Sequence, residues 1–247
     1  MMAEDNTLQD YTDLILERDR LSKEAELYRL DYIKRFGELI EKSFSLKIEC
    51  IRCKKIISEY LKAVNRGAGS KGMTLEQIRK AVNAEMASYE EQLKSIAAIR
   101  AQTGTVTSYE LAQIKKIYHK IATRIHPDIN PQLFGNEEVK ELWENVTSAY
   151  RSNDLDRMKE LEAVASTVIA KYCGDVVAVV IGDLDEKIEE IKAQITEIKS
   201  TDPYQYKYLL EDEEACAETE KNLKSEIEEY QEYLDYLNSQ MEALGIS

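Results

Sequence analysis

Proline and glycine, the residues that make tight turns, are scarce in this sequence. The 247-residue chain has three prolines and nine glycines. So few turn residues exclude β-sandwiches, barrels and collagen-like repeats. Long apolar runs are missing as well. The longest, residues 176–181, has six residues, whereas a membrane-spanning helix needs about 20. These absences predict an all-α protein of long helices that does not cross a membrane.

Cysteine and positive charge are also in short supply. The four cysteines have no spacing typical of a disulfide framework, and the first ten residues are polar and acidic. Both features predict a reducing, cytoplasmic location without a secretory signal. The chain has 33 Lys and Arg against 47 Asp and Glu, a net charge of −14. This balance argues against a protein whose main role is to coat nucleic acid or an anionic membrane.

Helical periodicity dominates what the sequence does contain, beginning with residues 1–101. The glycine-rich stretch 66–72 separates two amphipathic segments, and Thr74 with Gln77 forms a capping box for the second. The short connection predicts an antiparallel helical hairpin. Its first helix carries a near-heptad apolar seam: Leu39, Ser43, Leu46, Cys50, Cys53, Ile57, Leu61 and Val64. The seam could pack within the hairpin or against a partner helix.

A second, strongly acidic hairpin is expected in residues 173–247. Asp183 with Glu186 can cap one helix, and Asp202-Pro203 can start the next with proline at its first position. Residues 183–247 carry 19 acidic and 6 basic side chains, a net of −13. The run at 176–181 is interpreted as a buried helix, because a lone strand would have no partner in a helical chain.

The middle of the chain reverses the charge. Residues 111–125, LAQIKKIYHKIATRI, contain no acidic residue. Thr107 and Glu110 form a capping box for this helix. The segment carries four basic residues: Lys115, Lys116, Lys120 and Arg124. Its apolar face consists of Ile114, Ile117, Tyr118, Ile121 and Ile125.

The tripeptide His126-Pro127-Asp128 follows directly. The helix must end there, because proline has no N–H donor and disfavours helical backbone in the residue before it. Asn136 is a suitable N-cap for the next helix. The apolar stripe of that helix consists of Val139, Leu142, Trp143, Val146, Ala149 and Tyr150.

IKKIYHKIATRIHPDINP followed by ELWENVTSAY resembles the J domain of DnaJ-type co-chaperones. The resemblance covers about residues 105–152. It implies helix II at about 108–125, the HPD loop at 126–135 and helix III at about 136–151, within a unit spanning 102–172. Such domains bind a DnaK-type (heat-shock) ATPase chaperone in its ATP state and trigger hydrolysis. The resemblance implies that Asp128 contacts an arginine of the chaperone and that His126 orders the loop around Pro127. Lys115, Lys116, Lys120 and Arg124 would supply the docking face, although a solvated basic helix is the simpler alternative.

The chain departs from the family in two ways. The usual Tyr-x-x-Leu-Gly type motif of helix I is absent, and we expect Leu93, Ile96 and Ile99 to pack on helices II and III in its place. The glycine/phenylalanine linker and the zinc module of general DnaJ proteins are missing too. A specialised co-chaperone is therefore expected, with coiled-coil arms that bind a client or form a homo-oligomer. The alternative is a coiled-coil scaffold whose J-like region is degenerate.

Other chemistry finds little support in the residues. No glycine-rich phosphate loop, nucleophile elbow or His/acid cluster predicts an enzyme. Cys50 and Cys53 lack the second ligand pair that zinc requires and fall on the seam, so we expect them to be buried, with no metal or cofactor. His119 is expected at the surface. The acidic flanking segment would oppose nucleic-acid binding through the basic helix.

Overall fold

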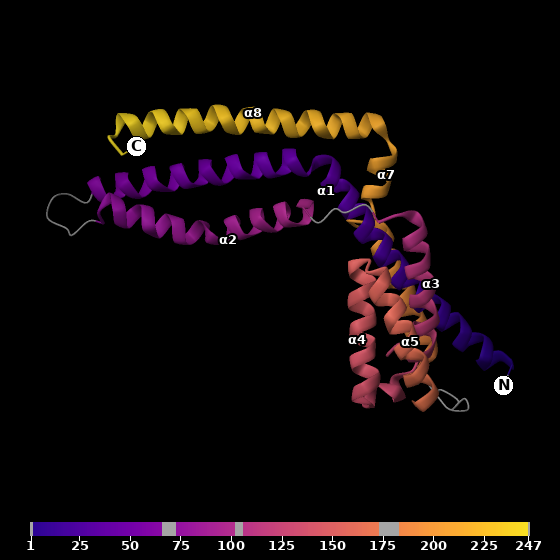
Figure 1. The fold of residues 1–247 in the computed structure, drawn as a ribbon. Helices are drawn as coiled ribbons and strands as arrows, with labels where there is room; N and C mark the ends of the chain where they lie inside the picture. Colours follow the sequence, from indigo (N-terminus) through magenta and orange to yellow (C-terminus); the bar gives the residue numbers. More distant parts are fainter. Residues whose placement is uncertain (1, 66–72, 102–105, 173–182, 247) are drawn as a thin grey trace. The chain divides into compact units, whose positions relative to one another are not determined.

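The computed structural model describes residues 2–65, 73–101, 106–172 and 183–246, and over these residues it contains helices and no strand. This confirms the all-α prediction for the described part. The glycine-rich stretch 66–72 and the run 176–181 lie outside it. The elements shown in Figure 1 are α1 (Met2–Asn65), α2 (Leu75–Ala101), α3 (Ser108–Ile125), the 3-10 helix η1 (Pro131–Gly135), α4 (Glu137–Ser152), α5 (Leu155–Tyr172), α6 (Leu184–Ser200), α7 (Tyr206–Glu211) and α8 (Glu213–Ala243).

The helices group into two compact units that share α1. The first unit comprises Met1–Tyr28 with Gly104–Tyr206, and the second comprises Arg29–Thr103 with Lys207–Ser247. This grouping does not follow the linear order that the sequence suggested. The helices α6 and α8, expected to form one acidic hairpin, belong to different units. The reason is that α1 is long enough to offer each of them a separate apolar surface.

In the second unit, α1 packs with α2 and α8. Three ion pairs join α1 to α2, Glu41 to Arg100, Arg52 to Glu90 and Lys55 to Glu85. Residue numbers rise along one helix as they fall along the other, so α1 and α2 run antiparallel. The helix α8 runs parallel to α1, since Arg35 pairs with Glu213 and Cys53 lies against Asn238.

The core of the second unit contains Cys50 and Cys53 of the predicted seam, and Ile57 packs against it partly buried. Cys50 and Cys53 are buried, and burial raises the pKa of both thiols. They act as small apolar side chains, as predicted. Leu61 and Val64, at the end of the seam, are exposed. The buried members of this core are Cys50, Cys53, Ile56, Ile78, Val82, Met86, Leu237, Met241 and Ile246.

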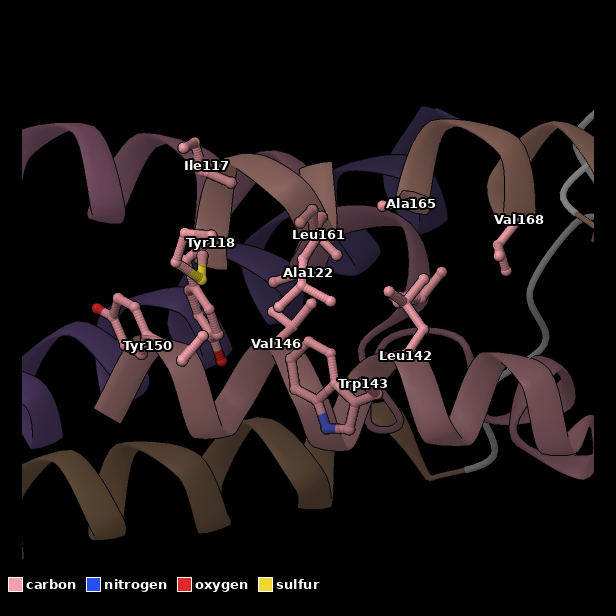
Figure 2. Close-up of a cluster of buried hydrophobic side chains, with 14 of the residues drawn as sticks. Ile117, Tyr118, Ala122, Leu142, Trp143, Val146, Tyr150, Leu161, Ala165 and Val168 are labelled. Carbon is pink, nitrogen blue, oxygen red and sulfur yellow. The ribbon is translucent and has the colours of Figure 1, made fainter. Parts of the chain in front are cut away.

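In the first unit, α3, α4 and α5 share one core (Figure 2). Leu93, Ile96 and Ile99 were expected to cover α3 and α4, but they belong to the second unit. The helix α5, which the sequence analysis did not assign, takes this place. Its side chains in this core are Met158, Leu161, Ala165 and Val168. The helix α5 follows α4 after a short turn. Packing it against α3 and α4 therefore costs less loop-closure entropy than packing a helix from a distant part of the chain.

Several helix ends form where the sequence places them. The capping box of Thr107 and Glu110 is complete, Thr74 and Gln77 exchange both capping bonds, and Asn136 caps α4.

The structure bears out the expected start of α6, directly after Asp183, and contradicts the expected start of the last helix. Asp183 precedes α6 in a left-handed conformation, and its side chain makes no capping hydrogen bond within the described part. The last helix does not begin at Pro203. Asp212 caps it instead, accepting hydrogen bonds from the backbone N–H groups of Glu214 and Ala215.

The start of α1 packs against α6 within the first unit. Ile129, which follows the HPD tripeptide, is part of this second apolar cluster. The loop is therefore held between α3 and the α1–α6 pair. The cluster's buried members are Tyr11, Ile15, Leu21, Ala25, Ile129, Ile188, Ile191, Ile195 and Tyr204.

Candidate functional site

The HPD loop begins where α3 ends. The N–H of His126 makes the last helical hydrogen bond, to the carbonyl oxygen of Ala122 at 2.9 Å. The carbonyl oxygen of His126 then accepts the N–H groups of Ile129 and Asn130, at 3.1 and 2.8 Å. Pro127 between them cannot donate, so the turn loses no hydrogen bond there. The result is a short ordered turn rather than a free loop.

His126 orders this turn from inside. Only 4% of the residue is exposed. Its Nδ1 accepts the backbone N–H of Asp128 at 3.0 Å, and Nε2 lies 3.3 Å from Oδ2 of Asp19. Because Nδ1 accepts, the network assigns the ring proton to Nε2. The ring also stands edge-on to Trp143, 4.7 Å between centroids, and Trp143 is buried as predicted.

Asp128 is accessible to solvent, with 43% of its side chain exposed, and Pro127 is half-buried. The carboxylate of Asp128 is nevertheless bonded within the chain. Oδ2 accepts a hydrogen bond from Nη1 of Arg18, in α1, at 3.1 Å. Arg18 also pairs with Asp19 at 2.8 Å; burial opposes its charge, but Asp19 and Asp128 outweigh burial and raise the pKa of Arg18. The residue proposed to contact an arginine of a partner therefore contacts one within its own chain.

Asp19 of α1 contacts the loop through His126. It accepts the hydroxyl of Tyr118 at 2.7 Å in addition to facing His126. Burial opposes its ionisation, but the hydrogen bonds from His126 and Tyr118 together with the charge of Arg18 outweigh burial, so the pKa of Asp19 is lowered. Tyr118 in turn stacks on Tyr150 of α4, with 3.9 Å between ring centroids (Figure 2). The loop, α1, α3 and α4 are thus joined by one polar and aromatic network.

The four basic residues of α3 divide into two pairs. Lys115 bonds to Glu24 of α1 at 3.0 Å, and Lys120 bonds to Glu162 of α5 at 2.8 Å. Lys116 and Arg124 are exposed. His119 is exposed too, as predicted. Lys115 and Lys120 of the predicted docking face are therefore neutralised by carboxylates of the same unit.

Sequence reasoning did not identify Arg18, Asp19 and Glu24 as members of this site. Arg18 lies 110 residues from Asp128. The sequence around it does not distinguish it from the many other charged residues of α1. A clue was nevertheless present. Arg18 follows Tyr11 and Ile15 at spacings of seven and three residues, which places it on the same face of α1 as those buried side chains.

Neither a metal site nor a membrane span is visible in residues 2–65, 73–101, 106–172 and 183–246. No group of His, Cys, Asp or Glu there could hold a metal ion, and no helix is long and apolar enough to cross a membrane. No protein-family model matches the chain, and no curated protein or solved structure is significantly similar to it.

Proposed function

We propose that the protein is a J-like co-chaperone that docks on a DnaK-type ATPase chaperone and stimulates its ATP hydrolysis. The observation that supports this most is the ordered loop between α3 and α4. It presents the carboxylate of Asp128 at the end of an antiparallel helix pair, while His126 fixes the backbone that carries it. A carboxylate held in place binds a partner's cation with less loss of entropy than a mobile one.

The surroundings of the loop support the same role. Lys116 and Arg124 remain exposed on α3, on the helix that leads into the loop. An exposed cationic face speeds encounter with an acidic partner. The helices α1, α2 and α8 of the second unit would serve as the arm that binds a client or a second copy of the chain.

A second candidate function is favoured by one contact, the Arg18–Asp128 ion pair. If this pair is permanent, Asp128 is a structural residue and the protein is a helical scaffold. The two functions differ in whether the carboxylate of Asp128 ever reaches a partner.

The substitution Asp128→Asn tests the proposed function, because it preserves volume and removes the charge. We expect the wild-type chain to stimulate single-turnover ATP hydrolysis by a DnaK-type chaperone, and Asp128→Asn to abolish the stimulation. The unfolding midpoint should move little, since a partly exposed ion pair contributes about 0.2–1 kcal/mol.

A matched control is Asp156→Asn in α5. This aspartate belongs to the same unit, is 92% exposed and pairs with Lys159 on its own helix. The Asp156→Asn variant should stimulate ATP hydrolysis by the chaperone as the wild type does. Equal stimulation by wild type and Asp128→Asn would show that the tripeptide is structural and would favour the scaffold.

A further inference from the structure

The start of α1 meets three residues of the proposed docking surface, Asp128, His126 and Lys115, with complementary groups. Arg18 bonds to the carboxylate of Asp128, and Asp19 faces His126. Glu24 bonds to Lys115. The fourth contact is the ammonium group of Lys23, which donates hydrogen bonds to the carbonyl oxygens of Tyr150 and Arg151 at the end of α4. These four residues, Arg18, Asp19, Lys23 and Glu24, are called the α1 cover below.

The charges of the α1 cover match those that a docking partner would need. A cation lies at the acidic loop residue and an anion at a basic residue of α3. Apolar packing holds the cover in register, because Ile15 is fully buried and Leu16 packs against the core of α3, α4 and α5. While Arg18 is bonded to Oδ2 of Asp128, its positive charge repels a partner's cation, and it occupies an acceptor position that a bidentate partner arginine would use.

We infer that the α1 cover is an internal competitor of the chaperone, so that docking requires Arg18 to leave Asp128. This inference rests on the proposed function. It adds that the chain limits its own activity, and that the limit is set by a contact within the first unit.

The competition is mild and reversible. The side chain of Asp128 is 43% exposed, and ion pairs in such surroundings are screened by water and salt. Releasing Arg18 should therefore change apparent affinity by roughly two- to fivefold. The buried contacts of Asp19 hold α1 in place meanwhile, so Arg18 can swing away without undocking the helix.

Arg18→Gln tests the inference in the full-length chain. We expect the concentration that gives half-maximal stimulation of the chaperone to fall roughly two- to fivefold relative to wild type. Arg35→Gln is the matched control. It lies on the same helix and loses comparable ion pairs, to Glu213 and Glu220, but belongs to the second unit. It should behave as the wild type.

Glu24→Gln is a second variant in case Arg18→Gln does not fold, which circular dichroism would reveal. It releases Lys115 and leaves Arg18 unchanged, and half-maximal stimulation should again move to lower concentration. Addition of Asp128→Asn to either variant should remove the stimulation, because the proposed function requires the carboxylate of Asp128 in both.

The possible failures are distinguishable. If wild type, Arg18→Gln and Glu24→Gln stimulate with the same half-maximal concentration, the proposed function stands and the competitor is refuted. If Arg18→Gln stimulates more strongly but does so without Asp128, release acts elsewhere and the inference is also refuted. If no folded variant stimulates, the proposed function fails and the inference fails with it.

Discussion

At the scale of single residues, Lys23 is a buried lysine of the first unit. It is 5% exposed, and its ammonium group lies 5.1 Å from the ring centroid of Tyr150 while it bonds to the last carbonyl groups of α4. A cation is favourable at a helix C-terminus, where carbonyl oxygens lack partners. Burial nevertheless disfavours the charge and lowers the pKa of Lys23 to about 8.

This pKa predicts a specific dependence of stability on pH. Between about 8 and the ordinary value of 10.5, the unfolded chain keeps a proton that the folded chain has released. The free energy of unfolding should therefore gain a rising contribution with pH, by at most about 1.4 kcal/mol per pH unit. Lys23→Met should lack this contribution. Urea unfolding of both proteins at pH 7.5, 8.5 and 9.5 measures it.

The comparison with Lys23→Met is needed because other groups act in the opposite direction. Burial raises the pKa of Cys50, Cys53, Tyr118 and Tyr150. The folded chain keeps these protons after the unfolded chain has lost them, so each lowers stability as the pH rises past its ordinary pKa. They are the same in both proteins and cancel in the difference. Parallel pH profiles would contradict the assignment to Lys23.

At the scale of elements, α8 packs into the core of the second unit through one of its faces. Leu237 is 4% exposed within the core of the second unit, whereas its neighbour Tyr236 is 58% exposed. The end of the helix is also tied down, since Arg79 of α2 donates a hydrogen bond to the carbonyl oxygen of Ile246 at 2.6 Å. The C-terminal helix is thus part of a three-helix layer.

Adjacent substitutions on α8 should therefore have very different effects. Leu237→Ala should lower the free energy of unfolding by about 2–5 kcal/mol, because it removes buried methyl groups and leaves a cavity. Tyr236→Ala should change it by about 0.5 kcal/mol or less. Chemical denaturation of the two variants checks this. Similar losses would mean that α8 does not use the face seen here.

At the scale of the whole molecule, two separately cored units share one helix. The first core includes Met158, fully buried, and the second includes Met86, 1% exposed. Segments that bury their apolar groups in different clusters tend to open as separate cooperative units. The continuous α1 is the element through which opening of one unit could influence the other.

Hydrogen exchange should reveal this division. Met158→Ala should speed amide exchange in α3, α4 and α5 and leave α2 and α8 nearly unchanged. Met86→Ala should do the reverse. The two variants serve as controls for each other, because each replaces one buried methionine by alanine, in a different unit. Exchange that rises equally in both units would show that the molecule unfolds as one.

The sequence by itself determined the helices around the candidate site. The bounds of α3 follow from the capping box at Thr107 and from Pro127, and the start of α4 follows from Asn136. These features act within about four residues, so no knowledge of the fold is needed to apply them. The burial of Cys50 and Cys53 likewise follows from the periodicity of one helix.

Only the tertiary structure decided which helices pack together. Many amphipathic stripes in this chain are interchangeable in pattern, so nothing local shows that α5 rather than α2 covers α3 and α4. Asp183 illustrates the limit at close range, because its left-handed backbone moves a suitable side chain out of capping position. The pairing of Arg18 with Asp128 spans 110 residues. It exists because apolar packing of Ile15 and Ile129 brings α1 to the loop, and packing between distant segments depends on the whole chain rather than on any one stretch of it.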